Sequence, residues 1–116
     1  MSVSTFDARV RSQNGMVTLD LEGEINAFAE EALNQAYTQA EQAGVSSILL
    51  NFSKVRYINS TGIALVVALL ARARKSKRSL IVYGLSDHYM EIFQITRLAD
   101  YMSVYPDEAS ALQAVQ

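Results

Sequence analysis

The stretch VSSILLNFSKVRYINSTGIALVVALLARARKS, residues 45–76, decides the fold. The continuous apolar run at 48–50, within a predicted strand at 45–52, is typical of a strand that is buried on both faces. Residues 59–61 then precede a helix that we expect to run to about Ser76, because apolar side chains recur there at helical spacing. A buried strand followed by a long helix predicts an α/β fold with right-handed parallel crossovers.

The N-terminal part of the chain predicts a β-hairpin and a helix. Residues 5–11 and 16–22 alternate apolar with polar side chains, which is the period of a strand buried on one face. The dipeptide at 14–15, Asn-Gly, is a strong two-residue turn signal. After residues 24–26, alanines and Leu33 recur at helical spacing until Gly44, the expected end of the helix.

The C-terminal part continues the alternation of strands and helices. Residues 80–83 predict another buried strand, 87–94 a short helix and 101–105 a small edge strand. Pro106 and the acidic residues after it favour a last helix. The expected order is β-β-α-β-α-β-α-(β)-α, with a mixed sheet because of the opening hairpin. No linker composition interrupts the chain, so we expect one domain over residues 1–116.

The composition excludes several classes of protein. Half of the residues are apolar and 19% are charged, the balance of a packed globule rather than of a disordered chain. The sequence has no cysteine and one histidine, His88, which excludes a disulfide framework and a multi-histidine metal centre. A net charge of −2 argues against general nucleic-acid binding. Because no nucleotide-binding motif or acid–base constellation is present, we expect neither a cofactor nor catalysis.

The sequence also predicts where the protein resides. The N-terminus lacks a basic region followed by an apolar stretch, the pattern of an export signal. The longest apolar run, residues 63–71, is far shorter than the about 18 residues of a membrane-spanning helix. We therefore expect a cytoplasmic protein without a membrane span.

The junction between the central strand and its helix is the candidate site. Asn59 or Ser60 can cap the helix by accepting a hydrogen bond from a free backbone N–H. One cap needs only one of them, which leaves Thr61 beside Gly62 in the first helical turn. A phosphoryl group there would lie at the positive end of the helix dipole. The junction also lies at the carboxyl edge of a parallel strand, where α/β proteins meet ligands and partners.

The helix itself predicts two apolar stripes. Ile63, Val66, Val67 and Leu70 form one stripe, which is sufficient to cover the sheet. Leu65 and Leu69 fall on the other side, which they share with Thr61. We interpret them either as casually exposed leucines or as a small recognition patch around a modifiable hydroxyl.

Four segments together resemble the STAS domain of anti-sigma factor antagonists. They are residues 21–26 (LEGEIN), 48–52 (ILLNF), 57–63 (YINSTGI), and Gly84 with the stretch 93–98, and they follow the family's order over nearly the whole chain. The resemblance implies a single STAS-like domain, a mixed sheet with helices mostly on one side.

The resemblance also implies a phosphorylation-controlled switch. Family members bind a serine/threonine kinase that is also an anti-sigma factor or a related regulator. The kinase phosphorylates one hydroxyl of the motif, which separates the complex, and a phosphatase resets it. Carried over to this sequence, Thr61 is the acceptor and Ser60 its neighbour and alternative. Asn26 and Asn59 stand where many members have aspartates; asparagine keeps the hydrogen bonding but not the charge. The expected partner-binding residues are Asn26, Asn59, Ser60, Thr61, Gly62, Leu65 and Leu69.

A second function uses the same surface without switching. A STAS adaptor, such as a small subunit that docks on a lipid-transporter ATPase, would bind stably through Thr61 and Leu65. A kinase and a phosphatase encoded nearby would favour the switch, and transporter genes would favour the adaptor. The sequence leaves the partner's identity and the oligomeric state open.

Overall fold

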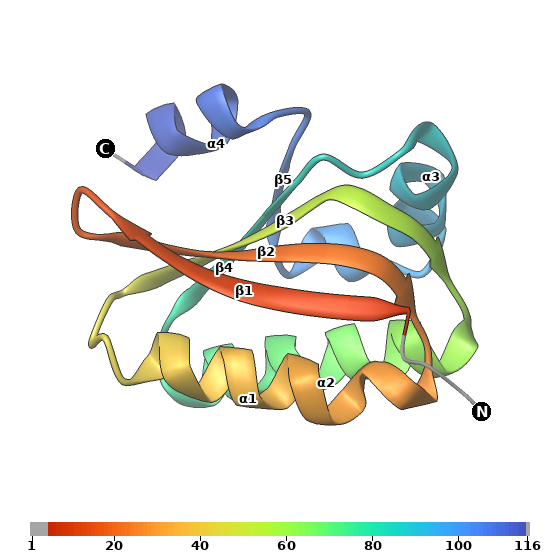
Figure 1. Ribbon diagram of the computed structural model, residues 1–116. Helices are drawn as coiled ribbons and strands as arrows, with labels where there is room; N and C mark the ends of the chain where they lie inside the picture. Colours follow the sequence, from red (N-terminus) through yellow and green to blue (C-terminus); the bar gives the residue numbers. More distant parts are fainter. Residues whose placement is uncertain (1–4, 116) are drawn as a thin grey trace.

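A computed structural model describes residues 5–115 of the chain (Figure 1). Strands, α-helices and two 3-10 turns alternate along it. The elements are β1 (Phe6–Gln13), β2 (Met16–Ile25), η1 (Ala27–Ala29), α1 (Glu30–Glu41), β3 (Ser47–Ile58), α2 (Ser60–Lys75), β4 (Ser79–Tyr83), α3 (Asp87–Ile95), η2 (Leu98–Asp100), β5 (Ser103–Tyr105) and α4 (Glu108–Val115). This order confirms the predicted one.

One five-stranded sheet in the order β1-β2-β3-β4-β5 organises the molecule. β1 and β2 are antiparallel, whereas the pairs from β2 to β5 are parallel, so the sheet is mixed as predicted. Asn14 and Gly15 both have positive φ, 55° and 78°, which is the conformation that the tight hairpin turn requires.

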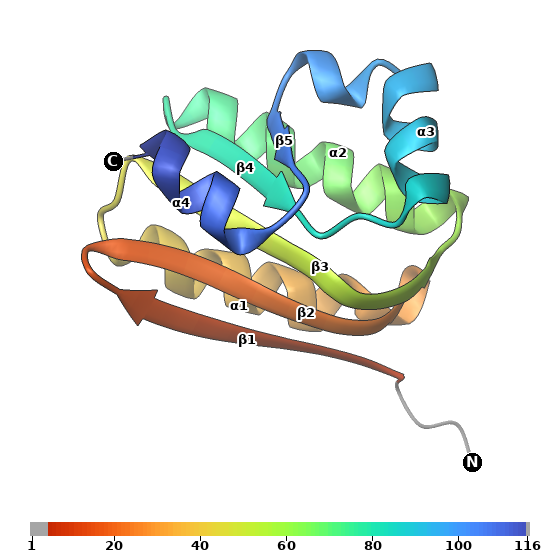
Figure 2. The ribbon, with the colours of Figure 1, turned by 90° about the horizontal axis from the view of Figure 1, so that it is seen from above.

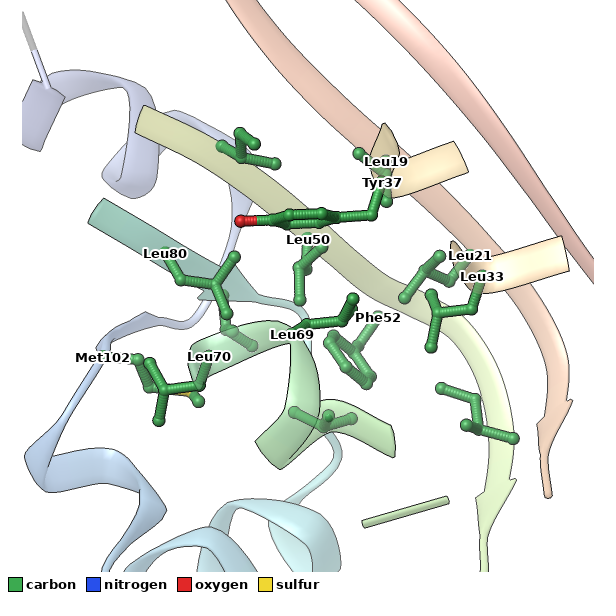
Figure 3. Packing of buried hydrophobic residues seen from close by; sticks show 14 of the residues in the cluster. Leu19, Leu21, Leu33, Tyr37, Leu50, Phe52, Leu69, Leu70, Leu80 and Met102 are labelled. Carbon is green, nitrogen blue, oxygen red and sulfur yellow. The ribbon is translucent and has the colours of Figure 1, made fainter. Parts of the chain in front are cut away.

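The two faces of the sheet are covered differently. Figures 1 and 2 show α1 and α2 side by side on one face and α4 on the other, above β3 and β4. The main core lies under the first face, where Tyr37, Leu50, Phe52 and Leu69 meet (Figure 3). A smaller apolar cluster between α4 and the sheet contains Leu49, Ile81, Tyr83 and Ala111.

β3 is longer than the sequence predicted. Its first half, rich in apolar residues, pairs with both β2 and β4, but from Lys54 to Ile58 it pairs with residues of β2. Lys54, Arg56 and Tyr57 in this second half are exposed. The second half therefore lacks the apolar run by which a buried strand is recognised. It carries the chain from the middle of the sheet to the candidate site.

Arg11 of β1 joins the hairpin to the C-terminal helix. Its guanidinium donates to Asp20 at 2.8 and 3.0 Å, to Glu108 of α4 at 2.8 Å and to the Tyr83 hydroxyl at 3.2 Å. These hydrogen bonds raise the pKa of Arg11, and the bond to Asp20 has the largest effect. The same bond from Arg11 is the main cause that lowers the pKa of Asp20.

Candidate functional site

The side chain of Asn59 caps the N-terminus of α2. Its Oδ1 accepts a hydrogen bond from the backbone N–H of Gly62 at 2.8 Å, and its carbonyl accepts one from Ile63 at 2.9 Å. Asn59 keeps an extended backbone, with φ −90° and ψ −177°. Of the two residues that the sequence offers as caps, Asn59 and Ser60, the structure uses Asn59.

Ser60 and Thr61 occupy the first two positions of α2, and both are exposed. Backbone N–H groups at these positions have no partner within a helix. The helix dipole adds partial positive charge at the same end. A phosphoryl group on either hydroxyl would therefore lie close to available donors and to a favourable dipole.

A second loop lies directly beside this junction. Ile25 at the end of β2 pairs with Ile58 at the end of β3, and its carbonyl accepts a hydrogen bond from the N–H of Asn59 at 3.2 Å. Asn26 then caps η1, because its Oδ1 accepts from the N–H of Phe28 at 2.9 Å. Two capping asparagines thus end adjacent parallel strands, and the structure brings Asn26 to the same edge as Asn59.

Gly62 holds the two loops together rather than facing a partner. It is buried, and a Cβ atom at this position would lie 2.0 Å from the Ile25 carbonyl oxygen and 2.8 Å from a side-chain carbon of Ile58. Only glycine lets the first turn of α2 approach β2 this closely. The expectation that Gly62 belongs to the partner-binding surface is therefore wrong, and its role is structural.

The predicted faces of α2 also need correction. Leu69 is fully buried at 0% exposure and packs among core residues of the sheet (Figure 3). Leu65 is half-buried and packs against the same core. Conversely, Val67, which was expected to cover the sheet, is 42% exposed. The prediction that Leu69 points away from the core is wrong.

The reason is the position of α2 among its neighbours. α2 contacts α1 as well as three strands, so its buried stripe is displaced toward the side that carries Gly62 and Leu69. The stripe consists of Gly62, Val66, Leu69, Leu70 and Ala73. The exposed side that continues from Thr61 is lined by alanines. They are Ala64, Ala68 and Ala71.

Two exposed aromatic side chains flank the capped loops. Phe28 of η1 is 76% exposed, and Tyr57, two residues before the Asn59 cap, is 49% exposed. Sequence reasoning missed both. The signal for Phe28 was present, since it falls outside the stripe of Ala29, Leu33 and Ala36 that faces the core.

Carboxylates also flank the loops. Glu24 pairs with Tyr57 across β2 and β3, and Glu30 and Glu31 occupy the first turn of α1. The basic residues of α2 lie in its last turn. The length of the helix places them roughly 20 Å from Thr61.

Neither a metal centre nor a membrane span is found in the described part of the chain. Residues 5–115 contain no group of three or more histidine, cysteine or acidic side chains placed to hold a metal ion. Within the same range, no helix has the length and apolar character needed to cross a membrane.

Comparison with known proteins points to one family. The family model described as the STAS domain matches residues 7–111. The chain is 30% identical to an anti-sigma-B factor antagonist of Staphylococcus aureus over 93 residues, 80% of this chain and 86% of that protein. It is 29% identical over 82 residues, 71% of this chain, to the antagonist of the same name from Staphylococcus epidermidis, of which the match covers 76%.

Solved structures share the fold. An anti-sigma factor antagonist from Mycobacterium paratuberculosis matches with a TM-score of 0.82 and 22% identity, over 95% of this chain and 93% of that one. The Bacillus cell fate determinant SpoIIAA, in its phosphorylated form, matches with a TM-score of 0.71 and 22% identity, over 94% of this chain and 99% of that one.

Proposed function

Because the chain belongs to the STAS domain family, we propose that it is an anti-sigma factor antagonist that works as a phosphorylation-controlled binding switch. Its partner is a serine/threonine kinase that also serves as an anti-sigma factor. The unmodified chain binds this partner, the phosphorylated chain is released, and a phosphatase resets it. The names of the relatives support this role, as does the existence of a phosphorylated form of the Bacillus relative.

The observation that carries the proposal is the exposed hydroxyl of Thr61 in the first turn of a helix that Asn59 already caps. Thr61 is thereby free to act as the phosphoacceptor. Its hydroxyl oxygen forms a bond to the γ-phosphorus of ATP, ADP leaves, and the hydroxyl proton passes to a base of the kinase. Ser60 is exposed beside it and is the alternative acceptor.

The partner-binding surface comprises both loops and the start of α2. We call this the junction surface, and we assign to it Asn26, Phe28, Tyr57, Asn59, Ser60, Thr61 and Ala64. Exposed aromatic side chains are frequent anchors of binding energy at protein interfaces, and Phe28 is the most exposed large apolar residue among 5–115. The small side chain of Ala64 lets a partner approach α2 closely. Leu65, half-buried, lies at the border of this surface.

Phosphorylation separates the partners through local charge. The added charge is about −1.5 to −2, which the N-terminus of a helix tolerates in the free chain. At an interface the same charge must lose its water, which is costly without cationic partners. The surrounding side chains include the carboxylates of Glu24, Glu30 and Glu31, which supply no such partner. The chain itself transfers no group in this scheme and acts as a binding protein.

Capture of the partner from the native cell tests the proposal. Unmodified wild type and Thr61→Ala are expected to retain the same kinase, and Thr61→Glu to lose it. After incubation with that kinase and ATP, peptide mapping should find the phosphate on Thr61. Ser60→Ala is the matched control, since it changes the neighbouring hydroxyl and should still be phosphorylated. Phosphate found only outside residues 59–62 would overturn the assignment.

A further inference from the structure

α3 lies beside the second half of β3, past the end of β4. β4 pairs with residues 47–51 of β3, and β3 continues from there to Ile58. Figure 2 shows β3 running on beyond the end of β4, with α3 on that side. The loop between β4 and α3 fits closely against β3, because a Cβ atom at Gly84 would clash with the side chain and the backbone of Ser53. α3 is thereby placed next to the strand that leads into the candidate site.

One side chain of α3 contacts the backbone at the end of β3. The Tyr89 hydroxyl accepts a hydrogen bond from the backbone N–H of Ile58 at 2.9 Å, and both residues are buried. Successive N–H groups of a strand point to opposite sides. The next one, of Asn59, accordingly points the other way and donates to the Ile25 carbonyl oxygen of β2 at 3.2 Å. The last residue of β3 and the cap of α2 are therefore held from both sides.

Tyr89 is itself fixed in place. Its side chain belongs to the main core, and the residue is 7% exposed. Its backbone N–H donates to the hydroxyl oxygen of Ser86, the N-cap of α3, at 3.3 Å. One turn further along α3, the ring of Phe93 meets that of Phe52 in β3 edge to face, with centroids 6.1 Å apart. Because α3 is anchored to β3 in this second way, removal of the Tyr89 hydroxyl should leave the helix where it is.

We propose that Tyr89 is a positioning residue for the phosphoacceptor: its hydroxyl holds the end of β3 and so keeps Thr61 where the kinase can phosphorylate it. This inference rests on the proposed function and adds a residue outside the junction surface. Thr61 lies three residues after Ile58, with the Asn59 cap between them. Without the Tyr89 oxygen, the Ile58 N–H is a buried donor that lacks a partner, and this part of the chain shifts to reach another acceptor or water. Phosphoryl transfer needs the reacting atoms in line, so a small displacement slows it.

The phosphorylation kinetics of Tyr89→Phe test the proposal, because this variant keeps the ring and removes only the hydroxyl oxygen. With the kinase that the wild type retains, we expect kcat for phosphorylation of Thr61 to fall by about tenfold. KM should stay within about threefold of wild type, since the exposed side chains of the junction surface, Phe28 and Tyr57 among them, are unchanged. A kcat equal to that of wild type would overturn the proposal.

Two other buried tyrosines provide matched controls. The Tyr83 hydroxyl also accepts one hydrogen bond, from Arg11 at 3.2 Å, but Tyr83 belongs to the smaller cluster beneath α4. Tyr83→Phe should therefore lose about as much stability as Tyr89→Phe while it keeps the wild-type kcat. Within residues 5–115, the Tyr37 hydroxyl has no hydrogen-bond partner, so Tyr37→Phe should change neither stability nor kcat appreciably. An equal fall of kcat in Tyr83→Phe and Tyr89→Phe would assign the effect to a general loss of stability and would overturn the proposal.

Amide hydrogen exchange tests the hydrogen bond without the kinase. In Tyr89→Phe the Ile58 N–H should exchange at least about tenfold faster than in wild type, whereas Tyr83→Phe should leave its exchange unchanged. Unchanged exchange at Ile58 in Tyr89→Phe would overturn the proposal. The two possible failures are distinguishable. A wild type that is never phosphorylated would overturn the proposed function and with it this role of Tyr89, whereas a Tyr89→Phe chain phosphorylated as fast as wild type would overturn the role of Tyr89 alone.

Discussion

One hydrogen bond from the Gly62 N–H to the side chain of Asn59 caps the N-terminus of α2. Replacing Asn59 by alanine leaves the Gly62 N–H without its acceptor, and we expect Asn59→Ala to lower the free energy of unfolding by about 1 kcal/mol. Asn59→Asp keeps the cap and adds a charge that suits the helix dipole, so its stability should stay within about 0.5 kcal/mol of wild type. Urea titrations of both variants measure this, with Ser60→Ala as the non-capping control. Equal midpoints for Asn59→Ala and wild type would show that the cap adds nothing.

The aromatic side chain of Phe28 is exposed and is not part of the buried core. We expect Phe28→Ala to weaken partner binding by about tenfold or more, because exposed aromatic anchors concentrate binding energy. Its melting temperature should change little, since the ring is 76% exposed. Ile95→Ala is a matched control, because Ile95 is 70% exposed at the C-terminal end of α3 and is not among the residues assigned to the junction surface. Equal losses of affinity in both variants would remove Phe28 from the surface.

The chemistry of single residues was partly readable from the sequence. Asn59 and Thr61 stand out because hydroxyl and amide side chains precede an apolar helix, the local pattern of a capped N-terminus. Gly62 was recognised as part of the motif, but the need for glycine at this position was not. Glycine is needed because the first turn of α2 lies close to the Ile25 carbonyl, a contact between residues far apart in the sequence. Phe28 was missed because one exposed apolar residue is common on any surface.

At the scale of the element, the buried and exposed sides of α2 should contribute unequally to stability. Leu69→Ala should cost about 2–5 kcal/mol, because it empties a fully buried site. Val67→Ala, on the same helix but 42% exposed, should cost less than about 1 kcal/mol. Thermal or chemical unfolding of both variants measures the difference. A larger loss of stability for Val67→Ala than for Leu69→Ala would support the sequence prediction that Val67 covers the sheet and Leu69 points away from it.

The elements could be predicted better than their orientation. Helical spacing places α2 correctly, but a helix that is apolar on most sides, as α2 is, does not define which side faces the sheet. That choice depends on α1, which packs beside it. The prediction for β3 was wrong in a different way, because it ended the strand too early. The second half of β3 carries exposed residues such as Lys54 and Arg56, so no apolar pattern indicates a strand there, although it pairs with β2.

At the scale of the whole molecule, Arg11 and Asp20 couple stability to pH. The hydrogen bond from Arg11 lowers the pKa of Asp20 in the folded chain below its ordinary 3.8. The ionised Asp20 side chain therefore contributes its full stabilisation at pH values above its ordinary pKa of 3.8. This contribution is lost as the pH falls from there through the lowered pKa of the folded chain. We expect Asp20→Asn to be less stable than wild type by about 1 kcal/mol at neutral pH.

The same variant should lose less stability on acidification. Between about pH 5 and about pH 2, the difference between Asp20→Asn and wild type should narrow, because wild-type Asp20 becomes protonated and loses its ionic partner. Denaturant titrations across that range measure it. Asp7→Asn, in an exposed ion pair with Arg9, is the control and should change stability by less than about 0.5 kcal/mol. A constant difference at all pH values would contradict the role of Asp20.

The overall architecture followed from the alternation of strands and helices, since short parallel crossovers leave few ways to arrange them. Contacts that close the molecule could not be predicted in this way. Arg11 and Glu108 are 97 positions apart, and nothing local in either segment marks them as partners. Such ion pairs depend on where α4 packs, which only the finished sheet determines.

Phosphorylation should act on the junction surface without refolding the molecule. Asn59 already satisfies the Gly62 N–H, and Gly62 anchors α2 against β2, so the added charge meets a start of the helix that is fixed in place. We expect amide NMR spectra of the two forms to differ mainly at residues 59–66. Changes should also reach the Asn26 loop, because the Ile25 carbonyl is bonded to the N–H of Asn59.

β1 and α4 provide the internal control for that spectrum. Arg11 of β1 joins them by its hydrogen bond to Glu108 of α4, and neither element contains a residue of the junction surface. A local charge that the helix dipole accommodates gives these elements no reason to move. Unchanged amide shifts in β1 and α4, together with loss of the partner, would support a local switch. Shifts spread through both would mean that phosphorylation changes the global conformation, and the local mechanism would have to be abandoned.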